Sequence, residues 1–270
     1  MLRGWDALNK MVTVTAKDIM QRGESLAPND SATKARAMIR RWGSRALPVL
    51  EGNKLVGILT RGDLIQRVTS SKTNLEVKDI MKKGVITSEP DEEIFSVAKK
   101  IIGTGARQIP VIENSEFLGI ITSSSIINAF VDNDYNPVKK NIAEVMQTDV
   151  VFVSPDDKVS QVWDKMRSGG FSGFPIVEKG KVLGFISRRD IFLRGSVRLS
   201  KESGKSRMTT VSKIMRQLVA VITPDKTTKE VAKYMIDRNV IRLPIVDNEK
   251  SMKLVGIVDA EDILRAYVGV

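Results

Sequence analysis

The stretch GILTRGDLI, residues 57–65, decides how the rest of the chain is interpreted. Its apolar first half is typical of a strand, and Thr60 followed three residues later by Asp63 is typical of a helix start. The same strand-to-helix junction occurs three more times and is changed each time. The other copies are GIITSSSII from Gly119, GFISRRDIF from Gly184 and GIVDAEDIL from Gly256.

Eight of the nine prolines repeat with a common spacing, two for each junction. Within each copy the two prolines stand 20 residues apart, and a residue that accepts a left-handed helix end precedes the second by five. Self-similarity of this kind indicates repeated structural units. The proline pairs are Pro28 and Pro48, Pro90 and Pro110, Pro155 and Pro175, and Pro224 and Pro244; the left-handed positions are Gly43, Gly105, Gly170 and Asn239.

Each copy contains the same series of predicted elements. In the first copy, apolar residues at helical spacing occupy 32–42, and two apolar segments, 46–50 and 54–60, flank the turn EGN. Residues 61–68 close the copy as a second helix. Together with a short segment before the first proline, each copy is expected to be strand, helix, strand, strand, helix.

One such unit cannot bury both faces of its small sheet, so the copies are expected to pair. We therefore predict an α+β fold of the α/β type, with four repeats packed as two pseudo-two-fold pairs. The first pair is expected over residues 1–135, with repeats at about 14–70 and 75–131. The second is expected over 139–270, with repeats at about 140–197 and 209–268.

The composition argues against most catalytic chemistry. The chain has no cysteine and no histidine, which excludes disulfides and the usual zinc sites and removes the most frequent general base. No catalytic motif is present, so we expect a protein that is not an enzyme. No apolar run approaches the ~20 residues of a membrane span. The first ten residues are too polar for a signal peptide, so we expect a cytoplasmic chain.

The order of methionine, proline turn, helix, LPVL and VGILTRGDL closely resembles the CBS domain, named after cystathionine β-synthase. The resemblance covers nearly the whole chain, and the four-copy layout is similar to that of the regulatory gamma subunit of AMP-activated protein kinase. It implies a non-catalytic sensor that binds adenosine-containing ligands in clefts between paired repeats. The candidates are AMP, ADP, ATP, NAD and S-adenosylmethionine, each as a regulatory ligand and none as a catalytic cofactor.

The resemblance also implies roles for the junction residues. In the family, the hydroxyl residue faces a phosphate and the aspartate accepts hydrogen bonds from the ribose hydroxyls. Repeat 1 matches fully with Thr60 and Asp63, and repeat 3 matches with Ser187 and Asp190. The residues alone are equally consistent with a helix cap, in which the aspartate returns to the backbone.

Repeats 2 and 4 depart from the pattern. Repeat 2 keeps Thr122 but has Ser125 in place of the aspartate, so we expect its cleft to be empty or weak. Repeat 4 keeps Asp262 as the ribose residue but has Asp259 in the hydroxyl position. Because a carboxylate there repels a phosphate, repeat 4 is expected to hold an uncharged nucleoside or nothing.

Basic residues just before the second proline are implied phosphate contacts. Arg45 in repeat 1 and Arg242 in repeat 4 are the favoured candidates, and Arg107 in repeat 2 is a weaker one. Repeat 3 has Ser172 and Gly173 there and offers no charge. Three arginines beside the caps are equally able to supply charge, and these are Arg61, Arg188 and Arg189.

The formal charge of +11 is concentrated in the second half, where residues 136–270 carry 24 Lys and Arg against 16 Asp and Glu. A basic excess favours polyanionic partners. The polar connector over 193–207 is either a solvated loop or a contact for nucleic acid or an acidic protein. A nucleic-acid-binding regulator is therefore the alternative function. The favoured function is a sensor with a protein effector and no membrane partner; the sequence leaves a homodimer open.

Overall fold

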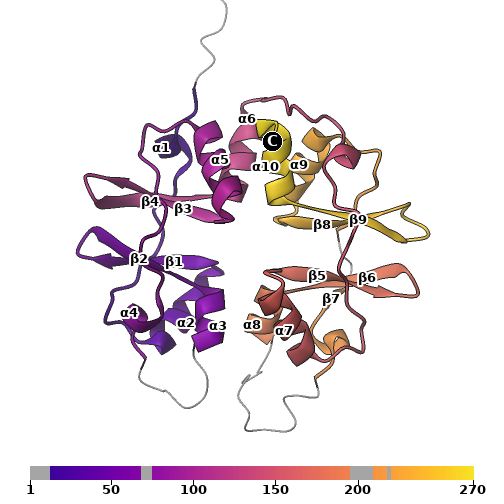
Figure 1. The fold of residues 1–270 in the computed structure, drawn as a ribbon, viewed down its shortest axis with the longest axis horizontal. Coiled ribbons are helices and arrows are strands. Elements are labelled where there is room, and N and C mark those ends of the chain that lie inside the picture. The colour runs from indigo at the N-terminus through magenta and orange to yellow at the C-terminus, as the bar shows by residue number, and fades with distance from the viewer. Residues whose placement is uncertain (1–12, 68–74, 195–208, 218–219) are drawn as a thin grey trace, which may run out of the picture.

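The computed structural model describes residues 13–67, 75–194, 209–217 and 220–270. Four similar units, two from each half of the chain, surround a common centre (Figure 1). We number them repeats 1 to 4 in chain order. The predicted α+β class and the four-repeat organisation are confirmed.

Each repeat is a β-hairpin between two helices, preceded by a short helical turn. The hairpins are β1 (Ala46–Glu51) with β2 (Lys54–Thr60), β3 (Gln108–Glu113) with β4 (Glu116–Thr122), β5 (Gly173–Glu178) with β6 (Lys181–Ser187), and β8 (Arg242–Val246) with β9 (Leu254–Asp259). The helices before them are α2 (Ala32–Trp42), α5 (Ile94–Thr104), α7 (Val159–Ser168) and α9 (Thr228–Asp237). The helices after them are α3 (Arg61–Arg67), α6 (Ser123–Asp132), α8 (Arg188–Arg194) and α10 (Ala260–Val268). The opening turns are α1 (Ala16–Ile19), α4 (Val77–Ile80), η1 (Ile142–Glu144) and η3 (Val211–Lys213), the last followed by β7 (Arg216–Gln217).

Local signals set the ends of these elements. Ser31 caps α2 by accepting a hydrogen bond from the Lys34 backbone N–H at 3.1 Å. The residue five before each second proline has a positive φ, as predicted, with 65° at Gly43 and 49° at Asn239. Each hairpin is antiparallel with one register irregularity. The hairpins of repeats 1 and 2 meet through Lys54 and Glu116 in a sheet of order β1-β2-β4-β3.

The opening turn of each repeat packs on the partner repeat of the same half. Bridges join Gln21 to Ile120 of repeat 2 and Lys82 to Ile58 of repeat 1. In the second half, Gln147 pairs with Ile257 of repeat 4, and β7 pairs with β6 of repeat 3. The two repeats of each half therefore exchange their opening turns.

This exchange explains the glycine that begins every junction. A Cβ on Gly57 would lie 2.7 Å from the carbonyl oxygen of Lys82 and 2.8 Å from Met81 Sδ, so no side chain fits at the crossing. The other three junction glycines face the corresponding methionine segments, and these pairs are Gly119 with Met20, Gly184 with Met215, and Gly256 with Met146. The repeated methionine thus lies over the junction glycine of its partner.

The two halves meet differently on opposite sides of the centre. Repeats 2 and 4 share one apolar core, in which the ring of Phe130 in α6 stacks on that of Tyr267 in α10 with centroids 4.6 Å apart. Repeats 1 and 3 keep separate cores, and Phe192 of α8 reaches into the core of repeat 1. Figure 1 shows α5 and α6 against α9 and α10 on one side, and α3 beside α8 on the other.

Candidate functional site

In repeats 1 and 3 the hydroxyl and the aspartate of the junction bind each other. Asp63 Oδ2 accepts hydrogen bonds from the Thr60 backbone N–H at 2.9 Å and from the Thr60 hydroxyl at 2.6 Å. Asp190 Oδ2 accepts from the backbone N–H and the hydroxyl of Ser187 in the same way. Both aspartates are buried. Oδ1 of Asp63 forms no hydrogen bond with any described residue, so one carboxylate oxygen remains to accept from a ligand.

In repeat 3 the corresponding oxygen is already bound. Arg216 of β7 donates from Nε to Asp190 Oδ1 at 2.7 Å. A ribose hydroxyl at this junction would therefore compete with a guanidinium. The sequence interpretation treated repeats 1 and 3 as equally complete and missed Arg216. The signal was its place directly after Met215, because the exchange of opening turns brings that position to the partner junction.

Repeat 2 keeps the cap without the charge. Ser125 Oγ accepts from the Thr122 backbone N–H at 2.9 Å, so serine replaces aspartate in the cap. A cavity of ≈ 690 Å³ lies beside this junction, between α1, α6 and the C-terminal end of α9. Its charged lining residues are Asp18 and Asp132, with no Lys or Arg among them. The expected weakness of this junction for a nucleotide stays a prediction.

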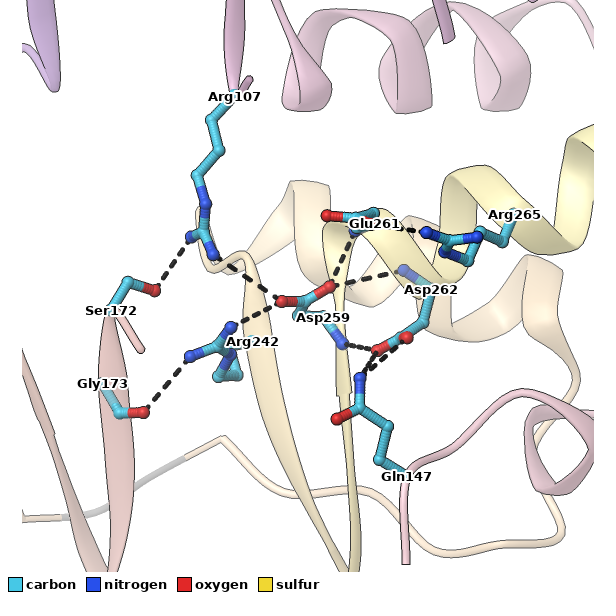
Figure 2. Close-up of polar contacts among 9 residues, drawn as sticks. All are labelled: Arg107, Gln147, Ser172, Gly173, Arg242, Asp259, Glu261, Asp262 and Arg265. Atoms are coloured by element: carbon cyan, nitrogen blue, oxygen red, sulfur yellow. Dashed lines mark hydrogen bonds and ion pairs between the residues drawn. The ribbon is translucent and has the colours of Figure 1, made fainter. Parts of the chain in front are cut away.

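Repeat 4 buries two carboxylates in one junction (Figure 2). Asp262 Oδ2 accepts from the Asp259 backbone N–H at 2.7 Å, and Gln147 Nε2 donates to Asp262 Oδ1 at 3.0 Å. Burial and the neighbouring charge of Asp259 raise the pKa of Asp262 to about 6. Gln147 follows Met146 as Arg216 follows Met215, so repeats 3 and 4 receive their extra donor by the same exchange.

Two arginines reach the Asp259 carboxylate from different repeats. Arg242 Nη2 donates to Asp259 Oδ2 at 2.5 Å, and Arg107 Nη2 lies 3.9 Å from the same oxygen. Both arginines also bind repeat 3, where Arg242 donates to the Gly173 carbonyl at 3.2 Å and Arg107 donates to Ser172 Oγ at 2.9 Å (Figure 2). Repeat 3, which lacks an arginine of its own at this position, thus receives two from its neighbours.

Arg45, by contrast, has no counter-charge. Its side chain forms no hydrogen bond or ion pair with any described residue. Burial and the nearby charges of four other arginines lower its pKa to about 10. A desolvated guanidinium without an acceptor is unfavourable unless an anion joins it. The four arginines are Arg107, Arg61, Arg242 and Arg189.

Repeat 3 places two arginines beside the junction of repeat 1. A Cβ on Gly62 would lie 3.7 Å from Arg188 Nη1, and one on Gly43 would lie 3.4 Å from Arg189 Nη2. The sequence pattern had offered these arginines only as charges beside their own cap. The structure brings them next to repeat 1, so the charge around that junction comes from both halves of the chain.

Neither a metal site nor a membrane span is found in the described part of the chain. No cluster of three or more Asp or Glu side chains there is suited to hold a metal ion. No helix within the same ranges combines the length and the apolar character needed to cross a bilayer.

Comparison with known proteins shows that this architecture occurs in other proteins. Protein MJ1225 of Methanocaldococcus jannaschii is 26% identical over 266 residues, which cover 89% of this chain and 93% of that protein. Its crystal structure has a TM-score of 0.80 at 21% identity, with 93% of this chain and 99% of that chain covered. The inosine-5'-monophosphate dehydrogenase of the same organism is 32% identical over 149 residues, 55% of this chain but 27% of the enzyme. Some relatives are therefore enzymes that this chain matches over a minor part of their length.

The family model for the CBS domain matches four segments, residues 16–70, 77–132, 142–195 and 211–269. Each segment contains one of the four junctions. Because these segments make up most of the chain, the protein belongs to the CBS domain family and contains four copies of the domain.

Proposed function

We propose that this protein is a non-catalytic sensor that binds an adenosine-containing ligand and transmits binding as a changed affinity for a protein partner. The observation that carries the proposal is the pair of unsatisfied groups in repeat 1. Among the described residues, Oδ1 of the buried Asp63 has no hydrogen-bond donor, and the half-buried Arg45 has no anionic partner. A nucleoside phosphate supplies both, with hydroxyls for the carboxylate and charge for the guanidinium.

In repeat 1 we assign Asp63 to the ribose and Thr60 and Arg45 to the phosphate, with Arg188 and Arg189 near enough to add positive charge. In repeat 3, Ser187 and Asp190 have the same roles, but a ligand must first displace Arg216. In repeat 4, Asp262 is the ribose acceptor for an uncharged nucleoside, and Arg242, the basic residue expected there, is bound by Asp259. AMP, ADP, ATP, NAD and S-adenosylmethionine remain the candidate ligands. Family membership supports the class of ligand without selecting among them.

Calorimetric titration of those five ligands tests the proposal. Asp63→Ala should abolish binding at repeat 1 while cooperative thermal unfolding persists. Asp63→Asn, which keeps the size of the side chain, should also lose binding because the charged ribose acceptor is gone. Ser125→Ala at the matching position of repeat 2 is the control and should leave repeat 1 unaffected. Unchanged affinity in both Asp63 variants would refute the ribose assignment.

The alternative is a nucleic-acid-binding regulator that uses the basic second half of the chain, with the connector over 193–207 as a candidate contact. Residues 195–208 lie outside the described part of the chain, so this alternative stays a hypothesis. It predicts that binding weakens steeply with added salt, because the affinity would come from phosphate contacts. A gel-shift titration at two salt concentrations would separate it from the sensor.

A further inference from the structure

Asp259 occupies the position that a hydroxyl residue holds in the other three repeats, and its two oxygens have separate partners (Figure 2). Oδ1 accepts hydrogen bonds from the backbone N–H groups of Glu261 at 2.8 Å and Asp262 at 3.3 Å, at the start of α10. Oδ2 binds the guanidinium of Arg242 and lies near that of Arg107. One carboxylate thus satisfies both a helix N-terminus and two cations, as a bound phosphate would.

The ionic contacts around Asp259 join three repeats and both halves of the chain. Arg107 comes from repeat 2, Arg242 from repeat 4, and both donate to the adjacent residues Ser172 and Gly173 of repeat 3. The side chains of Asp259 and Arg242 are each only 13% exposed, so solvent screens their attraction weakly. Burial alone would raise the pKa of Asp259, but the charges of Arg242 and Arg107 outweigh it and hold that pKa below its ordinary value.

Repeat 1 has the opposite arrangement at the equivalent positions. Thr60 is neutral, and Arg45 has no anionic partner among the described residues. The arginines of repeats 2 and 4 therefore have an anion built into the chain, whereas the arginine of repeat 1 has none.

We propose that Asp259 is an internal anion that takes the place of a ligand phosphate in repeat 4. It closes that junction to phosphorylated ligands and links repeats 2, 3 and 4 without any ligand. Phosphate binding is then restricted to the side of the centre formed by repeats 1 and 3, a consequence that rests on the function proposed above. Asp259 is accordingly a specificity-determining residue.

The test replaces the internal anion by a hydroxyl. Asp259→Thr should keep the helix cap, because Thr122 caps α6 from the same position. Arg107 and Arg242 would then lack their counter-ion. We expect the variant to unfold at a lower temperature than the wild type in sodium chloride. Inorganic phosphate at matched ionic strength should raise its unfolding temperature more than that of the wild type. Asp259→Asn keeps the shape of the side chain and should show the same gain in unfolding temperature. It therefore serves as the test if the threonine variant folds poorly.

Glu261→Gln is the matched control, since it removes one negative charge two residues away. Glu261 forms an ion pair with Arg265 at 2.9 Å and, within the described ranges, none with Arg242 or Arg107, so its variant should respond to phosphate as the wild type does. Equal phosphate responses in both Asp259 variants and the wild type would overturn the proposal and leave Asp259 as a helix cap. An equal gain in Glu261→Gln would also overturn it, because net charge alone would then explain the effect.

AMP titrations separate this inference from the proposed function. If the wild type binds no adenosine ligand but the Asp259 variants gain a phosphate response, the sensor proposal fails and the internal anion is supported. If the wild type binds AMP and Asp259→Thr binds one more per chain, both are supported. If the wild type binds AMP and the Asp259 variants gain neither phosphate nor AMP, the internal anion alone is refuted.

Discussion

At the level of single residues, the four junctions differ in what faces the acid one turn into the helix. One carboxylate oxygen of Asp63 has no donor among the described residues, whereas Asp190 binds Arg216 and Asp262 binds Gln147. Ser125 has replaced the acid in repeat 2. Because these partners differ in charge, the four junctions are expected to differ in affinity, and single substitutions should convert one type into another.

Restoring the acid in repeat 2 is the first conversion. Ser125→Asp should create or strengthen an adenosine site, because the carboxylate would take the place of Ser125 Oγ beside Thr122 and supply the missing ribose acceptor. The cavity at this junction leaves room for the ligand. Calorimetry should show one additional ligand per chain. Tight ligand binding by repeat 2 of the wild type would contradict the transfer of family roles to these positions.

Removing the competing cation in repeat 3 is the second conversion. Arg216→Gln should improve adenosine affinity at repeat 3 by about fivefold, since a half-exposed ion pair contributes at most ~1 kcal/mol. Lys82, from the opening turn of repeat 2, has the corresponding place at the repeat 1 junction and forms no ion pair with Asp63, so Lys82→Gln is the control and should change affinity little. A loss of affinity in Arg216→Gln would mean that Arg216 itself contacts the ligand.

The raised pKa of Asp262 predicts a pH dependence of stability. Its folded pKa of about 6 lies above the ordinary 3.8, so between these values the folded protein binds a proton that the unfolded chain has released. Lowering the pH from 7 to 5 should therefore raise the free energy of unfolding through this group by about 1 kcal/mol, which is part of the ~3 kcal/mol that the whole shift corresponds to. Urea unfolding of the wild type and Asp262→Asn at both pH values measures it. An equal pH response in the two proteins would contradict the prediction.

At the level of elements, the exchange of opening turns sets the most stringent packing requirement. Each junction strand passes under the methionine segment of the partner repeat, and the glycine in that strand permits the contact. Asp190 and Asp262 receive their additional partners through the same crossing. The exchange therefore makes the stability of each half depend on the glycine and the acidic residue at its junctions.

Gly57→Ala tests this packing. The added methyl group would meet the Lys82 carbonyl oxygen and Met81 Sδ, so we expect a loss of about 1–3 kcal/mol in the free energy of unfolding. Gly103→Ala in α5 is the control, because no atom lies within 4 Å of its Cβ position. Alanine there should stabilise the helix by about 1 kcal/mol. Equal stability of Gly57→Ala and the wild type in chemical denaturation would refute the close-crossing account.

At the level of the whole molecule, the shared core of repeats 2 and 4 holds the halves together on one side of the centre. The stack of Phe130 on Tyr267 lies in this core. The opposite side, between repeats 1 and 3, has less shared apolar surface and carries Arg45, which has no anionic partner in the part of the chain that the structure describes. A ligand at repeat 1 would therefore act where the two halves are joined less firmly.

Tyr267 tests how much the shared core contributes. Tyr267→Ala should destabilise the protein by about 3–5 kcal/mol, because it removes a buried ring. Tyr267→Phe should be neutral or stabilising, because the buried hydroxyl has no hydrogen-bond partner among the described residues. Thermal unfolding compares the variants. A large loss in Tyr267→Phe would show that the hydroxyl has a partner after all.

The sequence by itself determined the features that depend on local order. Hydrophobic spacing, prolines, capping residues and left-handed glycines act over a few residues, so the four repeats, their helices and hairpins and the Thr60–Asp63 type of junction could be predicted from them. The strand expected at the start of each repeat was wrong, because that segment, where the structure describes it, forms only a single bridge, as between Leu26 and Val49. The resemblance to the CBS domain added the expected class of ligand. The exact limits of the two pairs and the residue roles stay predictions.

Only the tertiary structure decided which residues share a junction. Arg216 reaches Asp190 through the exchange of opening turns. Arg107 approaches Asp259 although the two residues are 152 positions apart in the sequence. The position after the repeated methionine marks Arg216 in the sequence, but only the exchange brings it to Asp190, and nothing in the local pattern of Arg107 indicates its approach to Asp259. These pairings follow from the exchange of opening turns within a half and from the two halves closing around one centre, where charges from different repeats come within a few ångströms and burial makes their interactions strong.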